Sequence, residues 1–91
     1  MSGVLVTGGH GLVGTALQDK LAATYISSAE YDLRDPLQCD TMYRKYKPSH
    51  VIHLAAKIGG IKMNKERPAD LYYDNVMINT NVLHYAKEHG I

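Results

Sequence analysis

Residues 4–14 read Val-Leu-Val-Thr-Gly-Gly-His-Gly-Leu-Val-Gly, a short apolar run that leads straight into a glycine-dense turn. The run from Val4 to Val6 is rich in β-branched residues, as is typical of a strand buried on both faces of a sheet. Apolar residues at helical spacing follow the turn, from Leu12 to Leu21. The stretch therefore predicts a strand, a turn and a helix that begins inside the glycine motif.

The spacing of three glycines in this turn has a mechanical reason. We expect Gly8 to permit the tight turn, Gly11 to let a pyrophosphate approach the backbone, and Gly14 to let the helix pack closely on the strand. Backbone N–H groups and the positive end of the helix dipole would then face the phosphates. Glycine-rich turns also occur for geometric reasons alone, but a dinucleotide site requires this position between a strand and a helix. The motif lacks the Gly-Lys-Ser/Thr ending of a P-loop, which argues against a P-loop phosphotransferase.

The rest of the chain continues the alternation of strand and helix patterns. A second strand is predicted around Tyr25-Ile26 and a third over residues 50–54. Asp35-Pro36 supplies an N-cap and a first-turn proline for the helix between these strands. A long helix is predicted over residues 68–89, with Gly90 as its stop signal. This alternation predicts a parallel sheet with helices on its faces.

Helical spacing supports both of the later helices. In the first, Leu37, Met42, Tyr43 and Tyr46 can share a buried side. In the second, the residues that recur at three- and four-residue steps are Leu71, Tyr72, Val76, Ile78, Asn79, Val82, Leu83 and Ala86. Three amides, Asn75, Asn79 and Asn81, interrupt the long helix at a cost in helix propensity. We expect them either to bond neighbouring backbone or to be exposed.

Composition limits the function. Ten Lys or Arg and nine Asp or Glu in 91 residues give a formal charge of +1 without a block of like charges, so nucleic acid and membranes are not expected partners. The one cysteine, Cys39, excludes an internal disulfide, and we expect a reduced thiol packed in a helix. His50 and His53 would lie on opposite faces of a strand, so no metal site is expected. We find neither a secretory signal nor a membrane-spanning run, and expect a cytoplasmic protein.

The end of the second strand bears on the choice of cofactor. In NAD-selective sites an acidic residue there holds the ribose 2′-hydroxyl, whereas NADP needs a basic or small polar environment. Here Ser27 begins a Ser-Ser-Ala sequence and no acid comes before Glu30, which favours NADP over NAD. His10 either donates a hydrogen bond to the 2′-phosphate of NADP or is solvated. Asp32-Leu33 either contacts the adenine or forms a turn.

The opening motif, Asp32-Leu33 and His53-Leu54-Ala55-Ala56 resemble the extended short-chain dehydrogenase/reductases. A narrower resemblance, to the GDP-L-fucose synthases, is carried by Ala55 to Ile61, Asn64, Pro68-Ala69-Asp70, Tyr73-Asp74-Asn75, Ile78, Asn81 and His84. The resemblance implies a Rossmann-type sheet, NADP(H) as cofactor and an oxidoreductase that is also an isomerase. Such enzymes convert GDP-4-keto-6-deoxy-D-mannose to GDP-L-fucose by epimerising C3 and C5 and reducing the C4 ketone.

The resemblance assigns the glycine turn to the pyrophosphate and the loop after the third strand to the ribose side of the nucleotide. Together with the reasoning above, it gives a set of cofactor-binding residues in three segments of the chain. The set comprises Gly8, Gly9, His10, Gly11, Leu12, Val13, Gly14, Ser27, Asp32, Leu33, Ala55, Ala56 and Lys57.

The resemblance also implies that the catalytic groups lie elsewhere. Family members carry a catalytic Ser/Thr and a Tyr-x-x-x-Lys after a fourth strand, so we expect no catalytic residue within 1–91. The Tyr-x-x-x-Lys spelling from Tyr43 to Lys47 lies on a crossover helix, which right-handed geometry places on the flank of the sheet. We therefore expect an NAD(P)-binding βαβαβα half-domain, inactive alone, ending before the fourth strand and with an unpaired edge on its first strand.

Partners follow from the same resemblance. The full-length enzyme is expected to take a GDP-sugar and to form a homodimer, with the helix over 68–89 as a candidate contact surface. Two alternatives stay open: another NAD(P)-dependent sugar-nucleotide epimerase or dehydratase, and a nucleotide-binding module without catalysis.

Overall fold

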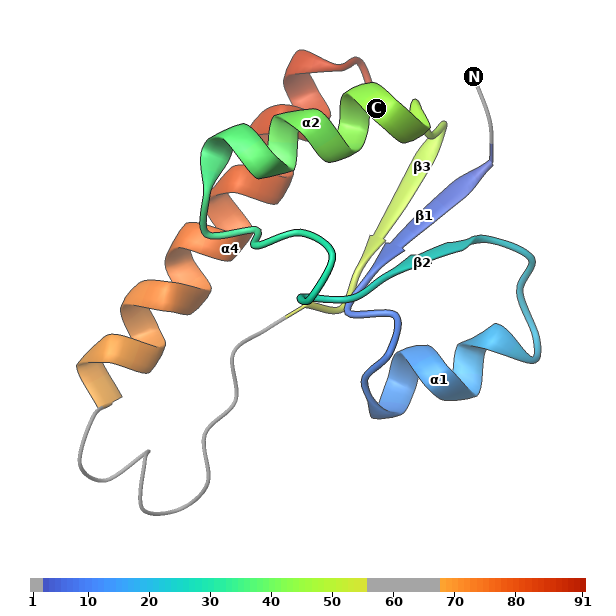
Figure 1. Ribbon diagram of the computed structural model, residues 1–91, viewed down its shortest axis with the longest axis horizontal. Coiled ribbons are helices and arrows are strands. Elements are labelled where there is room, and N and C mark those ends of the chain that lie inside the picture. The colour runs from blue at the N-terminus through green and yellow to red at the C-terminus, as the bar shows by residue number, and fades with distance from the viewer. Residues whose placement is uncertain (1–2, 56–67) are drawn as a thin grey trace.

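The computed structural model describes residues 3–55 and 68–91, which form one sheet with helices on both of its faces (Figure 1). The elements are β1 (Val4–Thr7), α1 (Leu12–Gln18), β2 (Thr24–Ile26), α2 (Pro36–Tyr46), β3 (His50–His53) and α4 (Pro68–Glu88). All strand pairs are parallel, which confirms the α/β class predicted from the alternating patterns.

The sheet has the order β2-β1-β3. Val6 of β1 lies between Tyr25 of β2 and Ile52 of β3, so both edges of β1 are paired. The expectation of an unpaired edge on the first strand was wrong, because the chain crosses over β1 after β2 and adds β3 on the other side. That reversal makes a topological switch point between β1 and β3 at the carboxyl edge of the sheet.

The main hydrophobic core lies between the sheet and the α2–α4 layer. Figure 1 shows α2 and α4 on one side of the strands and α1 on the other. The core cluster consists of Leu5, Ile26, Leu33, Cys39, Met42, Tyr43, Ile78 and Val82. Burial of each large apolar side chain contributes roughly 1.5–3 kcal/mol, so this layer contributes substantially to the stability of the fold.

Helix α2 begins where its sequence predicts, but one of the residues expected on its buried side is exposed. The Asp35 side chain accepts a hydrogen bond from the Leu37 N–H at 3.0 Å, and Lys47 ends the helix in the left-handed conformation. Leu37 was expected in the buried face and is 71% exposed. It precedes the buried Cys39 by two residues, which places it roughly 200° around the helix from the core.

Helix α4 packs on α2 through a narrower stripe than its apolar residues suggest. Leu71, Ile78 and Val82 are buried, whereas Tyr72, Val76, Asn79 and Leu83, which recur at the same helical spacing, are exposed. Gly90 follows with a φ of 73°, as expected of a helix stop. In the described ranges, none of the helices is long and apolar enough to cross a membrane.

Helix α1 buries little of its apolar surface. Gly14 is its one buried residue, and Leu12 is 91% and Val13 61% exposed. The apolar spacing from Leu12 onward predicted the helix correctly but not a buried face, because its first turn lies at the carboxyl edge of the sheet beside a cavity.

Candidate functional site

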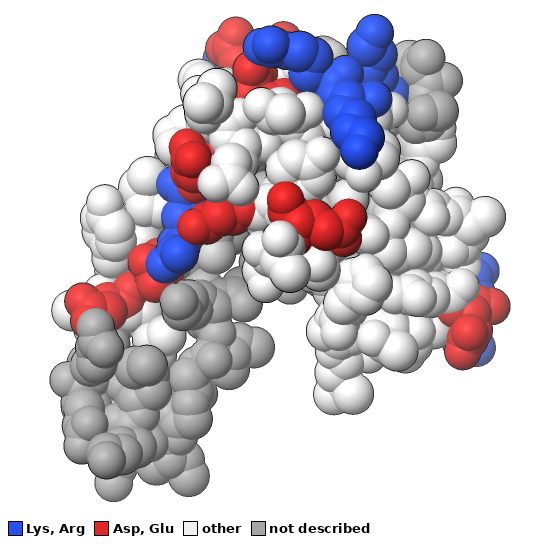
Figure 2. All heavy atoms as spheres, viewed as in Figure 1, with Lys and Arg blue, Asp and Glu red and all other residues white. Residues whose placement is uncertain are grey.

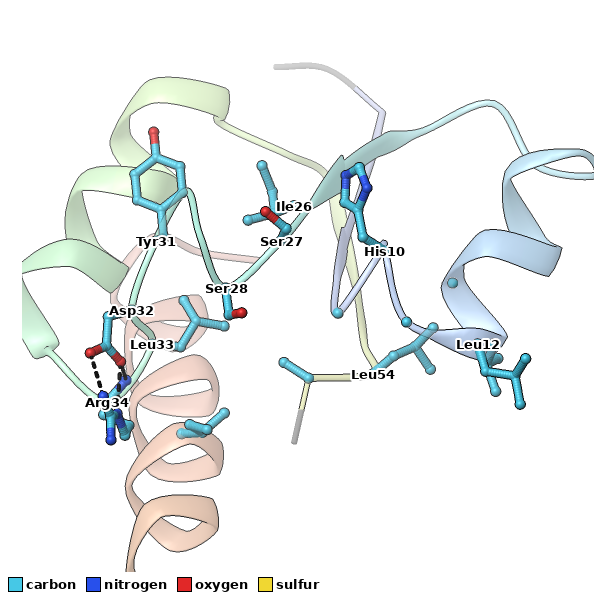
Figure 3. Close-up of a pocket in the computed structure, with 16 residues that line it drawn as sticks. His10, Leu12, Ile26, Ser27, Ser28, Tyr31, Asp32, Leu33, Arg34 and Leu54 are labelled. Atoms are coloured by element: carbon cyan, nitrogen blue, oxygen red, sulfur yellow. Dashed lines mark hydrogen bonds and ion pairs between the residues drawn. The ribbon is translucent and has the colours of Figure 1, made fainter. Parts of the chain in front are cut away.

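A cavity of about 870 Å³ lies at the carboxyl edge of the sheet, a volume typical of small-molecule sites. In Figure 3 the glycine turn with His10 and Leu12 lies on one side of it, and Tyr31, Asp32, Leu33 and Arg34 lie on the other. The predicted residues that line it are Gly8, His10, Gly11, Leu12, Val13, Gly14, Ser27, Asp32, Leu33 and Ala55. The structure thus brings residues from three distant segments around one space.

Gly8 is the point of closest approach between the two loops. Its φ of +68° is strained for any residue with a side chain, and a Cβ there would lie 2.7 Å from Ala55 N and Leu54 C. The turn out of β1 therefore lies directly against the segment that follows β3, and only glycine permits this contact.

Gly11 and Gly14 differ in what surrounds them. A Cβ on Gly14 would lie 2.5 Å from the Gly8 carbonyl oxygen, so this glycine lets α1 sit close against the turn. A Cβ on Gly11 would meet the same oxygen at 3.4 Å and no other atom within 4 Å, so Gly11 leaves open space beside the cavity. These contacts match the mechanical reasons for the glycine spacing.

The start of α1 presents backbone donors to this space. Gly11 is the N-cap, and no side chain caps the helix. The first helical bond is donated by the Thr15 N–H to the Gly11 carbonyl at 2.9 Å. The N–H groups of Leu12, Val13 and Gly14 come before that bond and have no acceptor within the helix. Because these residues line the cavity, the site has the donors that an anion requires.

Gly9 lies behind the site rather than in it. It does not line the cavity, and a Cβ there would lie 2.6 Å from the Tyr25 Cβ. Its N–H donates to the Ile26 carbonyl at 2.9 Å, and the Gln18 amide donates to its carbonyl at 2.7 Å. The geometry gives Gly9 a packing role between β1, β2 and α1. Two other predicted residues, Ala56 and Lys57, lie outside the described residues.

The end of β2 contains an acid that the sequence analysis discounted. Glu30 folds back so that its Oε1 accepts hydrogen bonds from the Ser27 N–H at 3.0 Å and the Ser27 hydroxyl at 3.3 Å. The carboxylate is therefore engaged by its own turn, and it does not line the cavity, whereas Ser27 and Ser28 do. The contact between Glu30 and Ser27 could not be predicted from sequence, because Glu30 lies three residues after Ser27 and reaches it only through the turn.

A cation that the sequence analysis missed lies at the rim of the cavity. The Arg34 guanidinium makes two bonds to the Asp32 carboxylate, at 2.9 and 3.0 Å, and lies 3.5 Å from Asp74. Hydrogen bonding to Asp32 and the charges of both carboxylates raise the pKa of Arg34 above its usual value. Asp32 also accepts from the Arg34 N–H at 3.0 Å, so it forms the turn that was its alternative explanation.

Other charges gather away from the cavity. In Figure 2 basic side chains cluster near the carboxyl end of α2, whose last turn contains Arg44 and Lys45. Cations there complement the helix dipole.

The floor of the cavity is apolar, and its residues come from the ends of β2 and β3, from the segment before α2 and from α4. Ile26, Leu33, Leu54 and Ile78 line it, with Tyr31 at its side. Leu33 is held in place because the buried Asn81 amide donates to its carbonyl at 2.9 Å. Ile78 could not be assigned from sequence, because only the packing of α4 on the sheet brings it to the cavity.

Helix α2, which carries the Tyr-x-x-x-Lys sequence, lies on one side of the sheet, as expected, and neither Tyr43 nor Lys47 lines the cavity. Tyr43 is fully buried and donates its hydroxyl to the Val82 carbonyl at 3.0 Å, while Lys47 is exposed. Burial, and then the neighbouring Cys39, raise the pKa of the Tyr43 phenol. Burial also raises the pKa of Cys39 to about 11. Both side chains therefore pack the core as neutral groups.

Comparisons with known proteins agree with this geometry. GDP-L-fucose synthase of Dictyostelium discoideum is 36% identical over 96 residues, which cover 97% of this chain and 30% of that protein. GDP-L-fucose synthase 1 of Arabidopsis thaliana is 39% identical over 94 residues, covering 97% and 29%. A solved GDP-L-fucose synthetase from Naegleria fowleri, bound to NADP, matches with a TM-score of 0.82 and 36% identity over 97% of this chain and 30% of that one.

The chain spans about 30% of the length of the curated relatives it matches. These likenesses confirm the resemblance to GDP-L-fucose synthases and the Rossmann-type fold. The model of the NAD dependent epimerase/dehydratase family matches residues 4–91. The chain therefore belongs to the NAD dependent epimerase/dehydratase family.

Proposed function

We propose that this chain is the NADP(H)-binding part of an enzyme that, like the GDP-L-fucose synthases, epimerises and reduces GDP-4-keto-6-deoxy-D-mannose to GDP-L-fucose. The observation that carries the proposal is the uncapped start of α1. There Gly11 leaves a space that a Cβ would fill, and the first-turn amides border a cavity of about 870 Å³. Such a helix start attracts a diphosphate through its N–H groups and its dipole.

The residues around the cavity divide into groups that suit the parts of a dinucleotide. The amides from Gly11 to Gly14 would hold the diphosphate. The apolar floor around Leu33 and Ile78 would hold the adenine. Ser27 and Arg34 line the part of the cavity that would receive the 2′-phosphate. The Arg34 guanidinium would supply the donors there, because the Ser27 hydroxyl donates to Glu30. By resemblance, Ala55, Ala56 and Lys57 would lie on the ribose side.

When bound, NADPH supplies the hydride that reduces the C4 ketone of the sugar. The described residues would bind and orient the cofactor. The amides from Gly11 to Gly14 would hold its diphosphate, and the apolar floor would exclude water from its adenine. By resemblance, the acid and base groups for epimerisation are proposed to lie outside residues 1–91. This chain alone is therefore proposed to bind cofactor without turnover.

The wider enzyme is proposed to be a cytoplasmic homodimer that takes a GDP-sugar, with residues 1–91 as its nucleotide-binding half-domain. The exposed side of α4 supports the dimer, because Tyr72, Val76 and Leu83 place apolar surface in solvent along one helix.

Two variants at one position test the diphosphate site. Asp and Asn are equally good N-cap residues, and the Gly11 backbone, with φ −79° and ψ −174°, accepts either. Gly11→Asp places a carboxylate on the amides proposed to hold phosphate, and Gly11→Asn places a neutral side chain of the same shape there. The purified chain and both variants are titrated with NADPH, with nicotinamide fluorescence and thermal unfolding as readouts.

We expect Gly11→Asp to be at least as stable as the parent, because a negative charge favours a helix start, yet to lose NADPH binding. Gly11→Asn should bind more weakly than the parent and more tightly than Gly11→Asp. If the parent binds NADPH and both variants bind equally well, the diphosphate lies elsewhere. If the parent does not bind, the proposal for this chain fails.

A further inference from the structure

The Thr7 hydroxyl, at the end of β1, has its hydrogen bonds fully specified by its neighbours. Thr7 is completely buried, and its Oγ1 accepts from the N–H of Leu54 at 3.2 Å and of Ala55 at 3.3 Å. Its third neighbour is the Nδ1 of His53, at 2.6 Å. The Leu54 N–H also donates to the Thr7 carbonyl at 3.0 Å, so it is shared between the two oxygens of Thr7. A hydroxyl has one hydrogen to donate, and the His53 Nδ1 is the acceptor that the described residues offer it. The hydrogen is therefore donated to His53.

This donation fixes the protonation of the imidazole. Nδ1 accepts from Thr7 and so bears no hydrogen, which places the ring hydrogen of a neutral His53 on Nε2. Nε2 lies 2.8 Å from Oδ1 of Asn79, an acceptor on α4. The direction of every hydrogen bond from the β3 loop through Thr7 and His53 to α4 is thereby determined.

Thr7, His53 and Asn79 are joined by these hydrogen bonds into a chain, which we call the relay. Their neighbours in sequence lie on three walls of the cavity. Gly8 follows Thr7, Leu54 and Ala55 follow His53, and Ile78 precedes Asn79, and all four of these neighbours line the cavity. The amides bonded to Thr7 belong to the Leu54–Ala55 segment, against which Gly8 packs. A Cβ added to Gly8 would lie 2.7 Å from the backbone of this segment. A shift of that segment would change the spacing of the walls.

We propose that His53 is a positioning residue for the nucleotide crevice. As the Nε2-protonated tautomer it orients the Thr7 hydroxyl, and the hydroxyl fixes the Leu54–Ala55 segment at its distance from Gly8. His53 does not itself line the cavity, so it acts through its neighbours. The effect on cofactor affinity rests on the proposed function, whereas the tautomer and the fixed segment do not.

The test compares Thr7→Val, which removes the hydroxyl at constant shape, with the matched control Thr7→Ser, which keeps it. His53→Asn retains an acceptor near the Nδ1 position, whereas His53→Leu removes both bonds. Nitrogen-15 NMR of the imidazole reports the tautomer, amide hydrogen exchange reports the Leu54–Ala55 segment, and NADPH titration reports the crevice. Circular dichroism verifies that each variant is folded.

We expect the parent and Thr7→Ser to show the Nε2-protonated tautomer. Thr7→Val and His53→Leu should exchange the Ala55 amide about fivefold faster and bind NADPH about fivefold more weakly, as expected for one lost hydrogen bond. The Leu54 amide keeps its bond to the Thr7 carbonyl and should change less. His53→Asn should restore the exchange rates and most of the affinity.

The proposal is overturned if His53 is protonated on Nδ1 in the parent, or if exchange in folded Thr7→Val and His53→Leu equals that in the parent. If Thr7→Val does not fold, the proposal is judged on the two His53 variants and on the imidazole spectrum of the parent. If the parent binds no NADPH, the proposed function fails, but the tautomer of His53 and the amide exchange rates still test the positioning role.

Discussion

Replacing Gly14 with alanine tests how closely α1 packs on the glycine turn. The new Cβ would lie 2.5 Å from the Gly8 oxygen and 2.6 Å from two Gly9 backbone atoms, so the turn must retreat by about 0.9 Å to reach an ordinary 3.4 Å contact. The backbone of the turn cannot move easily, because the Gly9 N–H is hydrogen-bonded to the Ile26 carbonyl. We therefore assign about 3 kcal/mol of destabilisation to the overpacking. Alanine regains about 1 kcal/mol of helix propensity, which leaves a net loss of about 2 kcal/mol.

Thermal and urea unfolding, followed by circular dichroism, measure this loss. For a chain of this size 2 kcal/mol corresponds to a Tm lowered by about 8–16 °C. Gly11→Ala is the matched control: its Cβ meets one atom, at 3.4 Å, and the loss should stay near the roughly 1 kcal/mol of a poorer N-cap. If Gly14→Ala is as stable as the parent, α1 does not lie against the turn as described, and the reasoning fails.

Two further predictions concern the α2–α4 layer. Burial raises the pKa of Cys39 from 9.0 to about 11, so at pH 8 its thiolate population should be about a hundredfold smaller than in the unfolded chain. A thiol reagent should therefore label Cys39 slowly until urea is added. Fast labelling of the native protein would contradict this prediction. The His89 hydrogen bond, then the Arg44 charge, lower the pKa of Asp40 below 3.8, so its stabilisation is present above that pH and is lost as pH falls through the folded pKa. Asp40→Asn should therefore be less stable than the parent at pH 7, with a difference that shrinks below pH 3.8 in urea titrations; a pH-independent difference would refute the assignment.

The parts of the fold that could be predicted from sequence are those fixed by local chemistry. The glycine spacing from Gly8 to Gly14 reflects contacts within one turn, so both the turn and the start of α1 were predicted correctly. Asp35 and Gly90 likewise act on backbone groups next to them, and they correctly marked a helix start and a helix end.

Burial of particular side chains was less predictable, because it depends on which neighbours a helix meets. Leu37 and Leu83 have suitable spacing for an apolar face, yet both point away from the core. A periodic pattern identifies a helix but does not determine how wide its buried stripe is when the opposite surface is also apolar.

The site itself was predicted where it follows a strand end and missed where tertiary packing creates it. The segments beginning at Gly8, Ser27 and Ala55 all follow strand ends. Ile78 reaches the cavity from a helix distant in sequence, and Glu30 returns to Ser27 through a turn. The order β2-β1-β3, which brings the walls together, was not predicted because strand order depends on crossover direction.

The central claim, that the uncapped amides of α1 bind the diphosphate of NADP(H), is tested most directly by amide NMR during an NADPH titration of the chain. The account predicts that the largest saturable shifts occur at the N–H resonances of Leu12, Val13 and Gly14. Titration with inorganic diphosphate should move the same three resonances. Saturable binding that leaves them unmoved, while other amides shift, would contradict the account.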